Sequence, residues 1–144
     1  MPYPEQFIAP MRAELTRLGV RELRTSADVD AAVMAPGVTM IVVNSVCGCA
    51  AGKARPGIAL ALQHDRRPDL VGTVFAGADV DATDRARAYF APFPPSSPSV
   101  GLLRDGKLVF MMQRSDIENR DARQIAERLT AAFDQHCQSP VRSA

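Results

Sequence analysis

Two of the three cysteines in this chain lie one residue apart, in a segment that reads NSVCGCAAG (residues 44–52). A cysteine is nucleophilic only as its thiolate, and the beginning of a helix stabilises that anion through free backbone N–H groups. Cys47 follows an apolar run and precedes small residues, which predicts a strand-to-helix junction and a lowered pKa. Lys53 and Arg55 are candidates to add positive charge. The pair is therefore a candidate site for thiol–disulfide exchange.

A disulfide between Cys47 and Cys49 would close a smaller ring than a C-x-x-C pair does. Departure from the preferred disulfide geometry makes such a bond easier to reduce, and Gly48 relieves only part of the strain. The pair is thus better suited to forming and resolving a mixed disulfide than to holding a stable bridge.

Metal binding is the main alternative for the same two thiolates, which would supply half of a tetrahedral zinc site. The other plausible ligands are His64, His136 and Cys137, and the spacing provides no second pair. Cys137 follows a helix end, where the helix dipole raises a thiol pKa, so we interpret it as structural. Both histidines are interpreted as helix caps. Exchange is favoured, and a metal-binding CxC module stays an alternative.

Composition predicts a single domain over residues 1–144, since the chain is long enough to bury a core without disulfides or metal. The formal net charge is +1, and the basic residues are scattered. We therefore expect neither a nucleic-acid nor a membrane partner. The first residues lack the order of a secretory signal, and the cysteine count is odd, which favours the reducing cytoplasm.

The elements that would position the cysteines follow from the hydrophobic pattern. A first helix is expected to end near Gly19, with Pro10 marking a late start, and its apolar face would consist of Phe7, Met11, Leu15 and Leu18. A second is expected from an N-cap at Ser26 to Pro36. A third would cover residues 50–64 with a kink at Pro56.

Three single strands and one hairpin are also predicted. Residues 20–23 are expected to form an edge strand, and residues 37–44 and 70–77 to form strands buried on both faces. Residues 99–112 form a predicted hairpin that turns at Asp105-Gly106, because both positions tolerate positive φ.

Two further helices are predicted, one before the hairpin and one after it. One helix is expected to open at Asp81, and a final helix should bury Ala122, Ile125, Ala126, Leu129, Ala132 and Phe133. The charged stretch at residues 114–123 is interpreted as a solvated face. The order predicts an α/β fold with a mixed sheet flanked by helices on both faces. Ligands in such folds bind beyond the strand carboxyl ends, where Cys47 falls.

A second candidate element lies about fifty residues after the cysteines. Pro98 directly precedes a predicted strand, where its peptide bond with Ser97 is a candidate for the cis form. The Ser97 backbone could there pair with an extended substrate. Together with the cysteines and Pro56, this order resembles a thioredoxin-like fold.

A narrower resemblance covers nearly the whole chain. Five segments are similar to the bacilliredoxin family, above all VVNSVCGCAAGKARP (residues 42–56), and also residues 9–16, 73–83, 95–99 and 129–137. The resemblance implies a cytosolic oxidoreductase that removes bacillithiol, a low-molecular-weight thiol, from oxidised proteins.

The family's residues carry over onto matching positions. Cys47 would attack the mixed disulfide and accept the bacillithiol, Cys49 would resolve it, and Ser97 and Pro98 would contact substrate. The implied partners are S-thiolated client proteins and the thiol co-substrate, with no bound cofactor and no metal. Protein disulfide isomerase activity is an alternative that uses the same residues.

Overall fold

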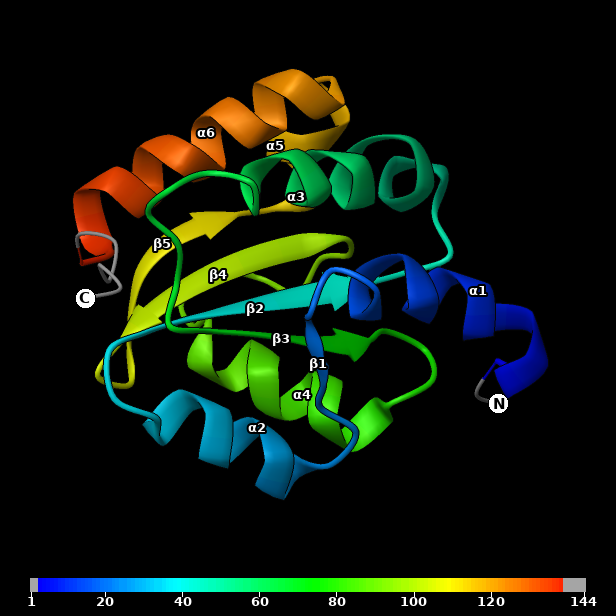
Figure 1. The fold of residues 1–144 in the computed structure, drawn as a ribbon. Helices are drawn as coiled ribbons and strands as arrows, with labels where there is room; N and C mark the ends of the chain where they lie inside the picture. Colours follow the sequence, from blue (N-terminus) through cyan, green and yellow to red (C-terminus); the bar gives the residue numbers. More distant parts are fainter. Residues whose placement is uncertain (1–2, 139–144) are drawn as a thin grey trace.

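A computed structural model of the chain describes residues 3–138, and its centre is a five-stranded sheet in the order β1-β3-β2-β4-β5 (Figure 1). The strands are β1 (Arg21–Glu22), β2 (Val38–Asn44), β3 (Leu70–Phe75), β4 (Ser99–Arg104) and β5 (Lys107–Met112). The helices are α1 (Glu5–Thr16), α2 (Ser26–Met34), the π-helical segment η1 (Ala50–Ala54), α3 (Arg55–Ala61), α4 (Val80–Tyr89), α5 (Arg114–Glu118) and α6 (Ala122–His136).

The sheet is mixed, as predicted. Strands β1, β3 and β2 run parallel, whereas β4 pairs antiparallel with both β2 and β5. Helices α3 and α6 cover one face of the sheet and α2 and α4 cover the other (Figure 1). The predicted α/β fold with helices on both faces is therefore confirmed.

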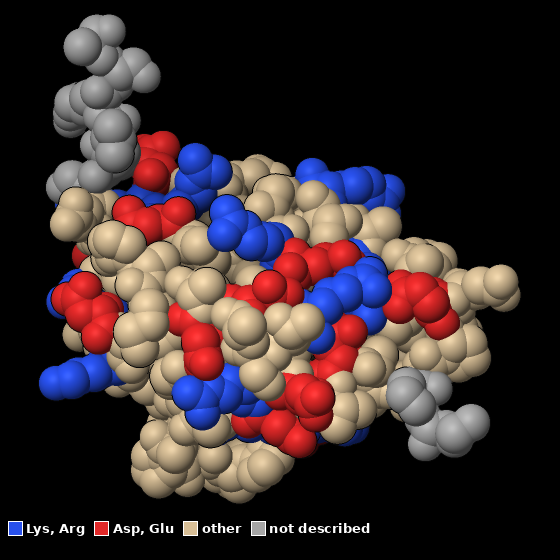
Figure 2. Space-filling view, turned by 90° about the horizontal axis from the view of Figure 1, so that it is seen from below, with Lys and Arg blue, Asp and Glu red and all other residues tan. Residues whose placement is uncertain are grey.

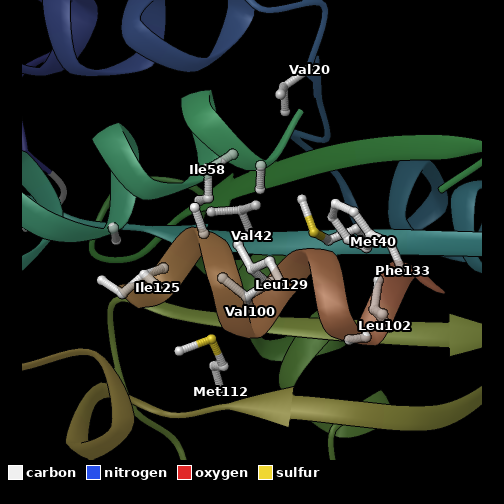
Figure 3. Packing of buried hydrophobic residues seen from close by; sticks show 14 of the residues in the cluster. Val20, Met40, Val42, Ile58, Val100, Leu102, Met112, Ile125, Leu129 and Phe133 are labelled. Carbon is white, nitrogen blue, oxygen red and sulfur yellow. The ribbon is translucent and has the colours of Figure 1, made fainter. Parts of the chain in front are cut away.

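Strand β2 lies at the centre of the sheet, and every one of its residues is buried. Its side chains alternate between two hydrophobic clusters, because successive residues of a strand point to opposite faces. Met40 and Val42 join the cluster under α3 and α6, where they face Leu129 and Phe133 of α6 (Figure 3). Ile41 and Val43 join the cluster against α2 and α4. This packing on both faces fixes the strand that leads into Cys47.

The hairpin between β4 and β5 turns where the sequence predicts. Asp105 and Gly106 have φ values of 50° and 82°, so both central residues adopt the left-handed conformation of a type I′ turn.

Helix α1 differs from the prediction in both its start and its buried face. It begins at Glu5 and contains Pro10, so the proline does not delay it. Leu15 is buried as predicted, but Ile8 and Arg12 are buried with it, whereas Phe7 is 53% and Leu18 39% exposed. The hydrophobic pattern did not predict this buried face, because one of the residues on it is the charged Arg12.

Arg12 can be buried because the carboxylate of Asp79 lies opposite it and pairs with its charge. Its two terminal nitrogen atoms each donate to Asp79 at 2.8 Å, and its guanidinium lies over the ring of Phe75. Asp79 also accepts a hydrogen bond from the Phe75 N–H at 3.1 Å. This ion pair fastens α1 to the carboxyl end of β3.

Three other boundaries differ from the predictions. The N-cap of α2 is Thr25, not Ser26, and Thr25 accepts the N–H of Asp28. Helix α4 begins at Val80, one residue before the predicted opening. The third helix changes from the π-helical segment η1 to the α-helix α3 directly before Pro56, and it ends at Ala61 instead of residue 64. The helix is thus irregular next to Pro56, where a proline inside a helix removes one backbone hydrogen bond.

Acidic and basic side chains are interspersed on the face that α2 and α4 cover (Figure 2). Two residues of this region, Arg85 and Asp30, form an exposed ion pair at 2.6 Å. Among residues 3–138, no helix combines the length and the hydrophobicity that a bilayer crossing requires.

Candidate functional site

Cys47 lies beyond the carboxyl end of β2, directly before the first helical residue, Gly48. Its carbonyl oxygen accepts the N–H of Ala50 at 2.9 Å, and its Sγ accepts the N–H of Cys49 at 3.3 Å. A side-chain acceptor for the free N–H groups of a first helical turn is what an N-cap provides. The sulfur of Cys47 plays that part here, so the predicted strand-to-helix junction is confirmed.

The pKa of the Cys47 thiol is lowered from its ordinary value, and opposing influences decide the direction. Burial is the largest single influence, and by itself it raises the pKa of Cys47. Hydrogen bonds from the Cys49 N–H and thiol, the positive charge of Arg114 and the N–H of Ala50 act against it and prevail. Cys47 is half-buried, so its sulfur combines thiolate character with access to solvent.

The pKa of Cys49 shifts the opposite way. Burial raises it first, followed by its hydrogen bond to Cys47, the negative charge of Cys47 and that of Glu118. Cys49 packs against the hydrophobic cluster beneath α6. Both thiols are free in this structure. The contacts therefore favour the thiolate form at Cys47 and disfavour it at Cys49.

Hydrogen bonds from polar side chains hold the turn that carries Cys47. The Ser45 hydroxyl accepts the N–H of Cys47 at 3.0 Å, and the side-chain oxygen of Asn44 accepts the N–H of Ser45 at 2.9 Å. Arg55, only 3% exposed, donates to that same Asn44 oxygen at 2.9 Å and to the Ser45 carbonyl at 3.0 Å. Its Nε lies 3.1 Å from a carboxylate oxygen of Glu14. The charge of Arg55 thus serves to hold the turn.

The cation that does act on the two sulfur atoms was not predicted. Lys53 donates to the Glu118 carbonyl at 2.5 Å, and the largest charge that lowers the pKa of Cys47 comes from another residue. Arg114, interpreted from the sequence as part of a solvated face, lies at the beginning of α5 and does lower it. Spacing could not reveal this, because Arg114 reaches Cys47 only through the return of β5 across the sheet.

The Ser97-Pro98 peptide bond is cis, in agreement with the hypothesis from the sequence. Ser97 lines a groove of about 340 Å³ together with Cys47 and Arg114. The structure therefore brings Ser97 and Cys47 to one groove, whereas Pro98 is buried.

The remaining predicted ligands lie elsewhere. Cys137 is buried, which together with the charge of Asp69 raises its pKa to about 11. His64 bonds Asp134 at 2.8 Å, and His136 is the last residue of α6. Within residues 3–138, no three His, Cys, Asp or Glu side chains are grouped closely enough to hold a metal ion. The zinc alternative has no further ligands there.

Comparison with known proteins identifies relatives along nearly the whole chain. The family model described as disulphide isomerase matches residues 3–137. A bacilliredoxin from Koribacter versatilis is 61% identical over 94% of this chain and 94% of its own length. A bacilliredoxin from Geobacillus kaustophilus is 50% identical over 95% of this chain and 94% of its own.

Solved structures resemble the fold at low identity. A thioredoxin mutant from Halobacterium salinarum superposes with a TM-score of 0.57 at 13% identity, over 82% of this chain and 90% of its own. Thioredoxin from Fasciola hepatica gives 0.54 at 15% identity, over 81% and 99%. These likenesses confirm the thioredoxin-like fold.

Proposed function

Because this chain belongs to the disulphide isomerase family and is a thiol–disulfide oxidoreductase like its bacilliredoxin relatives, we propose that it removes a low-molecular-weight thiol, bacillithiol, from protein mixed disulfides. The proposed domain is the whole chain, residues 1–144, although residues 1–2 and 139–144 lie outside the described part. The proposed setting is the cytoplasm, where small thiols are kept reduced.

One observation carries the proposal: the Cys47 sulfur is half-buried yet accepts a backbone N–H at the first helical turn, beside Arg114. These contacts make the thiolate form of Cys47 more populated than that of an ordinary cysteine, and the thiolate is the species that attacks a disulfide. Cys49, with its raised pKa, is held close by as the resolving thiol.

The first step is an attack of the Cys47 thiolate on the small-thiol sulfur of a client mixed disulfide. A bond forms between Cys47 and the small thiol, the bond to the client breaks, and the client leaves as a thiolate that takes up a proton. In the second step the Cys49 thiolate attacks Cys47 and releases the small thiol. The resulting Cys47–Cys49 disulfide returns to the reduced state at the expense of two further small thiols, which become oxidised.

Mass spectrometry with single-cysteine variants tests the assignment. A model protein carrying a bacillithiol mixed disulfide should lose the cap to the wild-type chain. Cys47→Ala should abolish this transfer, whereas Cys49→Ala should accumulate an adduct on Cys47. Full activity in both variants would contradict the proposal.

Disulfide isomerisation is a second candidate, because the matching family model carries that description. It would need the same nucleophile but a different substrate. Recovery of activity by a scrambled disulfide protein, measured beside removal of the bacillithiol cap at equal enzyme concentration, separates the two. Faster recovery of the scrambled protein with little cap removal would favour isomerisation.

A further inference from the structure

The groove beside Cys47 is built from segments distant in sequence. Besides Cys47, its lining includes Tyr3, Ser45, Gly77, Ser97 and Arg114. Its volume of about 340 Å³ lies at the lower end of the range for small-molecule sites. A space of this size beside a nucleophilic sulfur fits a small molecule joined to that sulfur better than it fits a folded protein surface.

The walls of the groove differ in chemistry. Tyr3 forms an aromatic wall: its backbone N–H donates to the Gly77 carbonyl at 3.1 Å, and its ring lies so close to Gly77 that a Cβ there would come within 2.6 Å of a ring carbon. Arg114 brings the positive charge, and of the described lining residues none is acidic. The groove thus offers an aromatic side chain and a cation, with the reactive sulfur among the same lining residues.

The guanidinium of Arg114 has N–H donors that are available to bind a ligand. Its Nε lies 3.4 Å from Glu118, and both side chains are about half exposed, at 49% and 46%. Water weakens such a pair strongly. No hydrogen bond joins either terminal nitrogen to another residue in the described part of the chain. Those two nitrogens present the planar fork that binds a carboxylate through two parallel hydrogen bonds.

We infer that this groove binds the small-thiol half of the mixed disulfide, and that Arg114 selects thiols that carry a carboxylate. The inference rests on the proposed function and adds the chemical class of the cap. Attack by Cys47 on the cap sulfur leaves the cap bonded to Cys47, beside the groove, while the client thiolate departs.

Two caps that differ in one group test this inference. A model peptide is capped with 3-mercaptopropionate or with 3-mercapto-1-propanol, which have the same chain length but differ in the carboxylate. Formation of the Cys47 adduct is then followed by mass spectrometry in the Cys49→Ala background. Because a charge-assisted hydrogen bond at a partly exposed site is worth a fraction of its buried strength, we expect a preference of about 3- to 10-fold for the carboxylate cap.

Arg114→Gln should remove the preference, and Arg114→Lys should keep part of it as a point charge. Since Arg114 also acts on the Cys47 thiolate, both rates are divided by the rate of alkylation with neutral iodoacetamide. Arg123→Gln is the matched control, because it removes an equal charge from a side chain that is 85% exposed and does not line the groove. It should retain the full preference.

Each outcome decides between the two proposals. Equal transfer of both caps by the Cys49→Ala protein, or an unchanged preference in Arg114→Gln, overturns the inference and leaves the proposed function standing. Failure of Cys47 to accept either cap overturns both. A preference that persists with an uncharged peptide and disappears in Arg114→Gln supports the inference, because no acidic client residue is then present to account for it.

Discussion

The buried guanidinium of Arg55 donates a hydrogen bond to the carbonyl oxygen of Ser45 at 3.0 Å, two residues before the proposed nucleophile. The same nitrogen donates to the Asn44 side chain at 2.9 Å. One cation in the first turn of α3 therefore holds the end of β2 and the turn after it in one arrangement.

Replacing Arg55 with Met should destabilise the protein and loosen this turn. The Ser45 carbonyl would lose its partner, and the expected loss in the free energy of unfolding is about 2–4 kcal/mol. Urea unfolding measures it. Arg123→Met, at an exposed position, should change stability by less than about 0.5 kcal/mol. Equal stability of the Arg55 variant and the wild type would show that the buried contacts contribute nothing net.

The pH dependence of alkylation should distinguish the two cysteines of the pair. The pKa of Cys47 is lowered and that of Cys49 raised, so the rate of Cys47 alkylation should reach its midpoint at a lower pH than that of Cys49. Iodoacetamide labelling followed by peptide mass spectrometry at several pH values measures both midpoints.

The single variants then test the causes. Cys47→Ala should lower the midpoint of Cys49, because the hydrogen bond and the negative charge that raise it are gone. Cys49→Ala should raise the midpoint of Cys47 only in part, since the backbone N–H at residue 49 remains. Midpoints that do not move in either variant would contradict the coupling between the two thiols.

Much of the fold follows from local patterns in the sequence. The uninterrupted apolar run before Asn44 has one stable place, the centre of a sheet covered on both faces, and Asp105-Gly106 specifies a tight hairpin. Cys47 at the end of the first of these is positioned by the same pattern. The location of the proposed nucleophile was therefore predictable from neighbouring residues alone.

What the sequence concealed are charges whose partners are distant along the chain. Arg12 is buried because Asp79 lies 67 positions further on, and a hydrophobic pattern therefore assigns the wrong face to α1. The residues next to Arg114 in the sequence are polar and typical of an exposed segment. Only the return of β5 brings Arg114 close to Cys47. Pairing of this kind depends on the fold as a whole, so no local pattern reports it.

Gly101→Ala should destabilise the protein through contact with a single ring. A Cβ at residue 101 would lie 2.4 Å from Cε1 of Phe90, which is buried in the cluster under α2 and α4. Such overpacking costs about 1–3 kcal/mol. In a Phe90→Leu background the ring atom is absent, so the same substitution should cost clearly less. Equal costs in both backgrounds, from denaturant unfolding, would rule out the ring as the cause.

Cys137 should contribute a loss of stability at alkaline pH. Its pKa is about 11 in the folded protein, because of burial and the charge of Asp69, against about 8.5 for an exposed thiol. The unfolded chain therefore gives up this proton first as the pH rises, and the free energy of unfolding should fall between about pH 8.5 and 11.

Comparison with Cys137→Ala isolates that contribution from the other groups that titrate in this range. At pH 7 the wild type should be the more stable protein, since alanine leaves the buried sulfur site unfilled. The difference should shrink by pH 10.5, because only the wild type has this thiol to ionise on unfolding. A difference that is the same at both pH values would mean that the thiol ionises as readily in the folded chain as in the unfolded one, and that its burial has no electrostatic effect.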